Sequence, residues 1–194
     1  MVYARDTVDA DGNKRVLELT VSGKLWRDAL VMRDRETHSL WTQHDGRAVV
    51  GPRSEQGLQM KALPSQKMSW AEAEALYPDA TVLKKRHSLL GRGMQDIYVD
   101  YRARKDDASV FGTGGGGVLP PKEEILGVAA NGHALAVRFE ALPADGTVEL
   151  EFAGQRLLFS RSGVTDLQGQ RIDARRMYWF AWKRAHPEAV LWEL

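Results

Sequence analysis

The sequence predicts an α+β fold in which antiparallel β-structure predominates, built from two related β-rich units that each close on a short tryptophan-bearing helix. Three observations support this prediction. Short, often alternating apolar runs separated by turn residues fill much of the chain. Asp-Gly and Asn-Gly pairs lie beside or between successive runs, as they do in β-hairpins. Two segments, 68–83 and 177–192, share one local pattern.

Composition limits the function classes. The chain has 194 residues, no cysteine, and a formal net charge of +1 from 27 basic and 26 acidic residues. Disulfides and cysteine metal sites are therefore excluded, and no overall field attracts nucleic acid. No apolar run approaches the roughly 20 residues of a membrane span. Residues 1–6 lack the apolar core of a signal peptide. We expect a soluble chain, cytoplasmic by default.

The first part of the chain contains strand patterns. Strands are predicted at residues 15–21, 29–32, 39–43 and 47–50. Asp11-Gly12 marks a turn before the first of them. Asp45-Gly46 joins the last two, and we expect a type I′ turn there because Asp-Gly supplies the positive φ values. Gly51-Pro52 then ends the strand.

A helix follows, with a capping box at its start. Ser69 and Glu72 can each satisfy free amides of the first turn. The helix should end before Pro78, and residues 80–83 should form a short strand. Residues 84–121 are expected to be irregular. Within them, the glycine- and proline-rich residues 103–121 should connect a first unit (1–102) to a second (122–194).

The second unit opens with the strongest hairpin signal in the chain. Residues 125–130 and 133–137 flank Asn131-Gly132. Residues 147–152 alternate strictly, so one face should be buried, and Ala153-Gly154 turns into residues 156–159. A helix is predicted from about residue 173 to residue 185, before Pro187.

Matched positions relate the two units. Trp70 and Trp179 are 109 residues apart, and the residues that follow each helix keep the same offset: Pro78 with Pro187, and Ala80 with Ala189. We expect each helix to pack its tryptophan against the sheet of its own unit, because tryptophan buries a large area.

Several phrases of the sequence resemble a known family. Val21-Ser22-Gly23-Lys24-Leu25, then residues 28–43, Gly46 and Gly51-Pro52, resemble the bacterial domain-of-unknown-function family DUF3179, with its phrases V-S-G-K-L, D-L-V-M-x-D-R-E-T-x-S-L-W-x-Q and G-P. Residues 121–128 and the C-terminal tryptophan helix also fit it. The resemblance implies a mostly β, internally duplicated architecture. It implies no reaction, since the family is one of unknown function.

The sequence also departs from that family. Members carry a C-P-x-C-x-x-G segment ahead of the matching region, whereas this chain begins at Met1-Val2-Tyr3, so we expect its start to lie inside the family's frame. His38 stands where a small residue is usual, and Trp26 and Arg27 replace smaller polar residues.

Ser39, Trp41 and Gln43 form the candidate binding surface, together with Asp28. In a strand the first three share one face, and an amide and a hydroxyl beside an indole suit a polar ligand. The alternative is that Ser39 and Gln43 bond to neighbouring backbone.

No catalytic constellation stands out, so the catalytic residues stay unknown and enzymatic activity stays open. No histidine pair has the helical spacing of a zinc site, and no G-x-S-x-G elbow exists. We expect no metal and no cofactor. Basic groups at 84–86 and 171–184 are interpreted as solvated, and no nucleic-acid partner is expected.

Three functions follow from these patterns. The first is a ligand- or partner-binding module without catalysis of its own, for a small molecule or a protein. The second is a redox- or metal-handling protein or enzyme whose cysteine segment is absent from this chain. The third is an oligomer formed through an exposed sheet edge.

Overall fold

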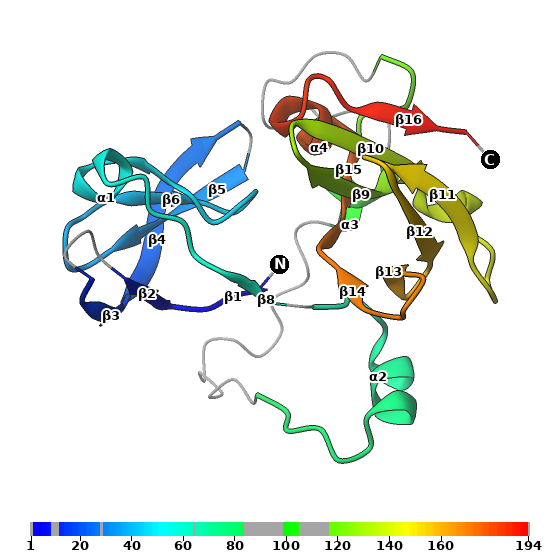
Figure 1. The fold of residues 1–194 in the computed structure, drawn as a ribbon, viewed down its shortest axis with the longest axis horizontal. Coiled ribbons are helices and arrows are strands. Elements are labelled where there is room, and N and C mark those ends of the chain that lie inside the picture. Colours follow the sequence, from blue (N-terminus) through cyan, green and yellow to red (C-terminus); the bar gives the residue numbers. More distant parts are fainter. Residues whose placement is uncertain are drawn as a thin grey trace.

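Short, mostly antiparallel strands are the main regular structure of the described chain (Figure 1). The protein is seen in a computed structural model that describes residues 2–8, 12–27, 29–63, 65–83, 99–104 and 117–193. We call residues 2–63 the N-terminal lobe and residues 117–193 the C-terminal lobe. The N-terminal lobe contains one buried hydrophobic cluster and the C-terminal lobe contains two. The predicted α+β fold dominated by antiparallel strands is confirmed. That the two β-rich parts are related units, with boundaries at 102 and 122, stays a prediction.

The N-terminal lobe contains a four-stranded antiparallel meander. Its order is β4 (Leu19–Trp26), β5 (Ala29–Asp34), β6 (Leu40–Thr42) and β7 (Ala48–Val50). Beside it lie the hairpin of β2 (Asp6–Val8) and β3 (Lys14–Val16), the pair of β1 (Val2–Tyr3) and β8 (Ala62–Leu63), and α1 (Pro52–Glu55). Leu17, Trp41, Ala48 and Met60 form its buried cluster.

Two details of the predicted N-terminal strands are wrong. The strand expected at 15–21 is interrupted, because Leu17 turns fully into the core while the amide of Glu18 bonds to the carboxylate of Glu36. The type I′ turn is absent, because only Gly46 of the pair Asp45-Gly46 has a positive φ (74°). The carboxylate of Asp45 instead accepts bonds from the Thr42 hydroxyl and the Arg47 amide and closes a longer loop.

The C-terminal lobe contains two four-stranded sheets. One has the order β15 (Ala174–Tyr178), β9 (Glu124–Ala130), β10 (His133–Arg138) and β16 (Val190–Trp192). The other runs β11 (Val148–Phe152), β12 (Gln155–Ser160), β13 (Gly163–Asp166) and β14 (Arg171–Ile172), and a 3₁₀ turn, η3 (Phe139–Ala141), follows β10. Asn131-Gly132 joins β9 to β10 with φ values of 53° and 77°, so the predicted hairpin is confirmed. Among the described pairs only β10 with β16 is parallel.

Alternation along β9 creates three layers in this lobe. Leu126 and Val128 face the β11–β14 sheet, where they join a cluster with Leu157 and Phe159. Ile125 faces the opposite way, toward α4 (Trp179–Ala185), and shares a second cluster with its tryptophans. The first sheet is therefore covered by the second sheet on one face and by α4 on the other.

The helix predicted from residue 173 to residue 185 is wrong in its first half. Residues of β15 pair antiparallel with β9, from Ala174 opposite Val128 to Tyr178 opposite Glu124. The alanine, arginines and methionine of this stretch are good helix formers. The open edge of β9 offers them a partner, and this tertiary pairing overrides the local preference.

The two tryptophan helices have the same local structure. The bounds of α4, 179 and 185, each lie 109 residues after those of α2 (Trp70–Leu76). The caps also agree, with φ −136° and ψ 65° at Tyr77 against φ −130° and ψ 78° at His186. The predicted capping box of Ser69 and Glu72 is present.

Their tertiary environments differ. Trp179 is 2% exposed, whereas Trp70 is 61% exposed and α2 has no buried residue. The prediction that both tryptophans pack against a sheet is therefore wrong for Trp70. Residues 80–83 are not a strand, since no described strand pairs with them, whereas β16 lies against β10. In Figure 1, α2 lies near β14, away from the N-terminal meander.

Residues 84–121 are predicted to be irregular. Their described part contains one short helix, α3 (Val99–Ala103). Residues 84–98 and 105–116, which hold most of the expected connection, lie outside the described residues. No helix in the described part of the chain is long and apolar enough to cross a membrane.

Candidate ligand-binding cleft

Two of the residues predicted to bind a ligand lie in the interior. Ser39 and Trp41 are both 0% exposed. The indole Nε1 of Trp41 donates to Oδ2 of buried Asp34 at 2.7 Å. The Ser39 hydroxyl lies 2.7 Å from the Thr37 hydroxyl and accepts from the backbone N–H of Arg53 at 3.1 Å. These side chains therefore join the loop after β5 to α1 from within.

Gln43 and Asp28 complete the predicted set. Gln43 is half-buried in the turn after β6, and its backbone carbonyl oxygen accepts a bond from the Tyr3 hydroxyl at 2.9 Å. Asp28 lies outside the described residues. Ser39, Trp41 and Gln43 thus do not form one open face, and ligand binding by this set stays a prediction.

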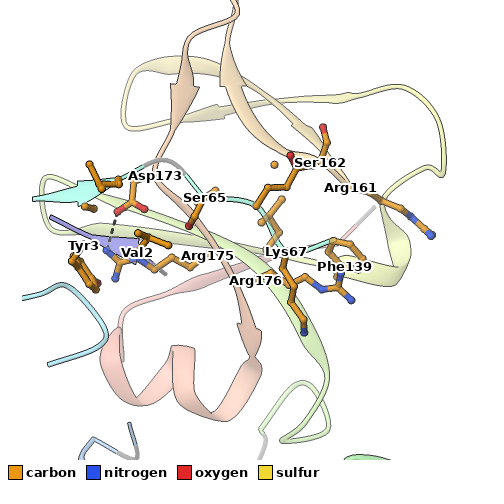
Figure 2. Close-up of a pocket in the computed structure, with 16 residues that line it drawn as sticks. Val2, Tyr3, Ser65, Lys67, Phe139, Arg161, Ser162, Asp173, Arg175 and Arg176 are labelled. Carbon is orange, nitrogen blue, oxygen red and sulfur yellow. Dashed lines mark hydrogen bonds and ion pairs between the residues drawn. The ribbon is translucent and has the colours of Figure 1, made fainter. Parts of the chain in front are cut away.

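A cavity of about 220 Å³ lies between the two lobes (Figure 2). Its N-terminal wall comes from β1 and β8, which contribute Val2, Tyr3, Ala62 and Leu63, and Ser65–Lys67 continue this wall. The opposite wall comes from η3, the turn after β12, and β15. We call this space the interlobe cleft. Its shape depends on both lobes, because neither wall encloses it alone.

Charged side chains gather at one end of the cleft. Nζ of Lys67 lies 3.0 Å from Oε1 of Glu124, while Nε of Arg176 donates to Oε2 of the same carboxylate at 3.0 Å. Burial alone would raise the pKa of Glu124, but the bonds from Arg176 and Lys67 outweigh it and lower that pKa below its ordinary value. Glu124 is therefore ionised at neutral pH and is shared by two cations.

Phe139 brings a second arginine to the same end. The guanidinium carbon of Arg176 lies 3.5 Å from the centre of the Phe139 ring, and that of Arg161 lies 5.9 Å from it. Arg161 donates to the carbonyl oxygens of Leu142 and Glu140. Among the described residues no carboxylate pairs with Arg161.

The other end of the cleft is charge-balanced. Nη2 of Arg175 lies 2.9 Å from Oδ2 of Asp173, the ion pair drawn as a dashed line in Figure 2. Tyr3 lies beside this pair. Burial raises the pKa of Tyr3 to about 12, with Asp173 and Asp45 adding to the effect and Arg175 opposing it. Tyr3 therefore keeps its proton at neutral pH.

A mostly apolar cavity of about 330 Å³ adjoins the cleft. Leu63, Val164, Ile172 and Ala174 contribute its apolar lining, and Leu63 and Ala174 also line the cleft itself. Arg171 stands at its rim and donates to the amide oxygen of Gln66 at 3.3 Å. The two spaces therefore form one depression with an apolar end and a cationic end.

The lobes meet again at a smaller cavity of about 130 Å³. Nη1 of Arg27 donates to the Ala185 carbonyl at the end of α4 at 3.1 Å, and Nε2 of His44 donates to the Arg27 carbonyl at 3.1 Å. His44 and His186 both line this cavity. Burial lowers the pKa of His44, and the charges of Arg175 and Arg27 lower it further, against the opposing effects of Asp45 and the Arg27 carbonyl.

Sequence patterns did not identify the cleft. Arg171, Arg175 and Arg176 are among the basic groups interpreted as solvated. Arg175 and Arg176 belong to β15 and line the cleft, whereas Arg171 belongs to β14 and lines the adjoining cavity. Lys67, Arg161 and Phe139 come from three separate segments, so no spacing could join them. Within the described residues no group of three or more histidine, aspartate or glutamate side chains is placed to hold a metal ion.

Comparison with known proteins identifies the family. Searches among curated proteins and among solved structures each found no match to the chain. A family match covers residues 1–166, which includes the N-terminal lobe and the C-terminal lobe as far as β13, while β14, β15, α4 and β16 lie beyond it. It agrees with the family that the phrases of residues 21–52 resemble. The chain therefore belongs to the family described as Protein of unknown function (DUF3179).

Proposed function

We propose that this chain is a ligand-binding module without catalysis of its own, and that its small-molecule ligand occupies the interlobe cleft. One observation carries the proposal: a cavity walled by both lobes, with four cationic side chains and two serines on its lining. Ligand sites are commonly concave, lie where two structural parts meet, and place a few polar groups beside apolar surface. The interlobe cleft has these features.

The chemistry of the lining supports binding over proton transfer. Its ionisable side chains are those of Lys67, Arg161, Arg175 and Arg176, with Asp173 and Tyr3. Arginine does not lose its proton in proteins, Asp173 is held in an ion pair, and Tyr3 keeps its proton because burial raises its pKa to about 12. These groups are suited to holding a ligand in place.

Filling the cleft tests the proposal. Ser65→Trp places a large ring in it from the exposed connecting segment, and Thr147→Trp places one at an exposed position outside it. We would screen a library of small metabolites by thermal shift on the full chain. Ligands that raise Tm should act on the wild type and on Thr147→Trp but not on Ser65→Trp. If every stabilising ligand also acts on Ser65→Trp, or if none is found, the proposal is wrong.

A partner role is favoured by a separate observation. β4 lies at the edge of its sheet and exposes apolar side chains, with Val21 at 71%, Leu25 at 50% and Trp26 at 41% exposure. An open apolar edge is a template for another strand, so we propose that two copies pair through β4. Light scattering should show a dimer that Val21→Lys dissociates. A monomer at all concentrations contradicts this pairing.

A further inference from the structure

The cleft as a whole carries more positive than negative charge on its lining. Lys67, Arg161, Arg175 and Arg176 line it, while the carboxylates that pair with them are Asp173 and Glu124. Arg175 is matched by Asp173, and Glu124 is shared by Lys67 and Arg176. Arg161 adds a charge with no carboxylate partner in the described chain. Four cations therefore face two carboxylates, which leaves room for a further negative group.

The position of that excess is defined by Phe139. The guanidinium groups of Arg161 and Arg176 both lie within 6 Å of its ring centre, at 5.9 and 3.5 Å. Two like charges held near one ring repel each other, and an anion within reach of both would reduce that repulsion. Guanidinium groups bind carboxylate and phosphate oxygens. Nε and Nη2 of both arginines already donate to protein oxygens, so an anion would be bound by their remaining N–H groups. The serine hydroxyl of Ser162 lines the same space.

Carboxylates along the neighbouring groove limit how far the excess positive charge extends. Along the groove that continues toward α2, Glu72 and Asp145 join the lining. Glu72 is held in the capping box by the hydroxyl and amide of Ser69. The excess positive charge is thus confined to the region between Lys67 and Arg161, and does not extend along the groove as a nucleic-acid track would.

The opposite end is suited to hydrocarbon. Leu63, Val164, Ile172 and Ala174 form the apolar part of the adjoining cavity of about 330 Å³, which shares Leu63, Ser65 and Gly163 with the cleft. Its lining also includes Lys61, Arg171 and Asp173. A ligand with only a charged group would leave this apolar surface wet. A ligand with only an apolar body would leave the cations without a partner.

We propose that the cleft binds an amphiphilic small anion, with a carboxylate or phosphate group between Lys67, Arg161 and Arg176 and a short hydrocarbon body beside Leu63 and Ile172. This inference rests on the proposed ligand-binding function and adds the chemical class of the ligand. The two candidate ligand types share a negatively charged oxygen group at one end of a short hydrocarbon chain.

Calorimetric titration of the full chain tests the cationic end and the apolar end of the cleft separately. Hexanoate and hexyl phosphate contain both features, acetate contains only the head, hexan-1-ol only the body, and hexylamine has the opposite charge. We expect the two six-carbon anions to bind about tenfold or more tightly than the other three, because buried methylene groups and charge pairing both contribute. Added salt should weaken them. A lower Kd for hexyl phosphate than for hexanoate identifies phosphate as the head group. A lower Kd for hexanoate identifies carboxylate.

Substitutions test the residues at each end. Lys67→Gln and Arg161→Gln should each weaken hexanoate about fivefold or more, corresponding to the loss of one charge-assisted bond. Leu63→Ser should weaken hexanoate but not acetate. Arg156→Gln, which removes an exposed arginine of β12 paired with Glu149, is the matched control and should change nothing. Circular dichroism of each variant checks its fold, and exposed Lys67 is the variant least coupled to folding.

The outcomes distinguish this inference from the proposed function. If hexan-1-ol binds as tightly as hexanoate and Ser65→Trp abolishes both, the cleft binds ligands but the anionic class is wrong. If none of the five probes binds while the library yields a ligand that Ser65→Trp blocks, the inference alone fails. If neither the probes nor the library yields such a ligand, both fail.

Discussion

Gly127 of β9 lies directly against the indole of Trp182 in α4. A Cβ atom added at Gly127 would stand 2.7 Å from Cε2 and Cζ2 of that ring. Gly127→Ala must therefore displace α4 from the sheet, and we expect a loss of about 1–3 kcal/mol in the free energy of unfolding, as for other overpacked cores. Chemical denaturation measures it.

A double-mutant cycle ties this loss to the ring. In a Trp182→Phe background the smaller ring leaves room for the methyl group, so Gly127→Ala should cost less there. Ala129→Ser, at an exposed position of the same strand, is the control. If Gly127→Ala lowers the free energy of unfolding equally in both backgrounds, the contact between Gly127 and the Trp182 ring is not the cause of the loss.

The buried bond between Trp41 and Asp34 gives a second prediction. Trp41→Phe keeps a ring in the core but removes the donor 2.7 Å from the Asp34 carboxylate. We expect a loss of about 1–3 kcal/mol, because a buried carboxylate oxygen loses its shorter bond and keeps only the Thr37 hydroxyl at 3.2 Å. Trp70→Phe, at a position 61% exposed, should change the free energy of unfolding by less than about 0.5 kcal/mol. Similar effects of both substitutions would contradict the assigned burial.

His44 predicts how the fold responds to acid. Burial lowers its pKa from 6.5, so the folded chain favours the neutral ring and the unfolded chain binds more protons between the two pKa values. The contribution of His44 to the free energy of unfolding is fully present above pH 6.5 and declines as the pH falls below that value. The groups around it are Arg27 and Asp45 in its own lobe and Arg175 and His186 in the other.

Denaturation between pH 7.5 and about pH 5 measures this response. We expect His44→Asn to lose less stability than the wild type over that interval. His133→Asn, at the exposed start of β10, is the matched control. Parallel curves for the wild type and His44→Asn would remove His44 as a source of acid sensitivity.

The capping box of α2 gives a local prediction. Ser69→Ala removes the hydroxyl that accepts from the Glu72 amide, which costs the helix about 1 kcal/mol. Since α2 has no buried residue, we expect faster hydrogen exchange within α2 and an unchanged midpoint for global unfolding. A global loss as large as the local one would show that α2 is coupled to the core.

Local patterns predicted the elements whose cause is local. The Asn131-Gly132 hairpin, the alternating strand β11 and the capping box of Ser69 each depend on neighbouring residues alone. The family match over residues 1–166 likewise rests on the order of residues along the chain. These features needed no knowledge of distant contacts.

Distant contacts changed the rest. Residues 174–178 have the composition of a helix and form β15 because β9 offers an open edge. α2 and α4 share one local structure, yet only α4 meets a sheet face that can accept its tryptophans. Ser39 and Trp41 have the alternation of an open strand face and lie in the interior because the loop after β5 and α1 close over them.

The sequence by itself therefore determined the β-rich class, the hairpins, the helix caps and the family of this protein. Only the tertiary structure decided which tryptophan is buried and where the interlobe cleft lies. The physical reason is that caps and turns are satisfied within a few residues, whereas a cleft exists only where separate segments meet. Lys67, Phe139, Arg161 and Arg176 lie on four separate segments that line one cleft, and the pairing of β15 with β9 that places Arg176 there follows from no local rule.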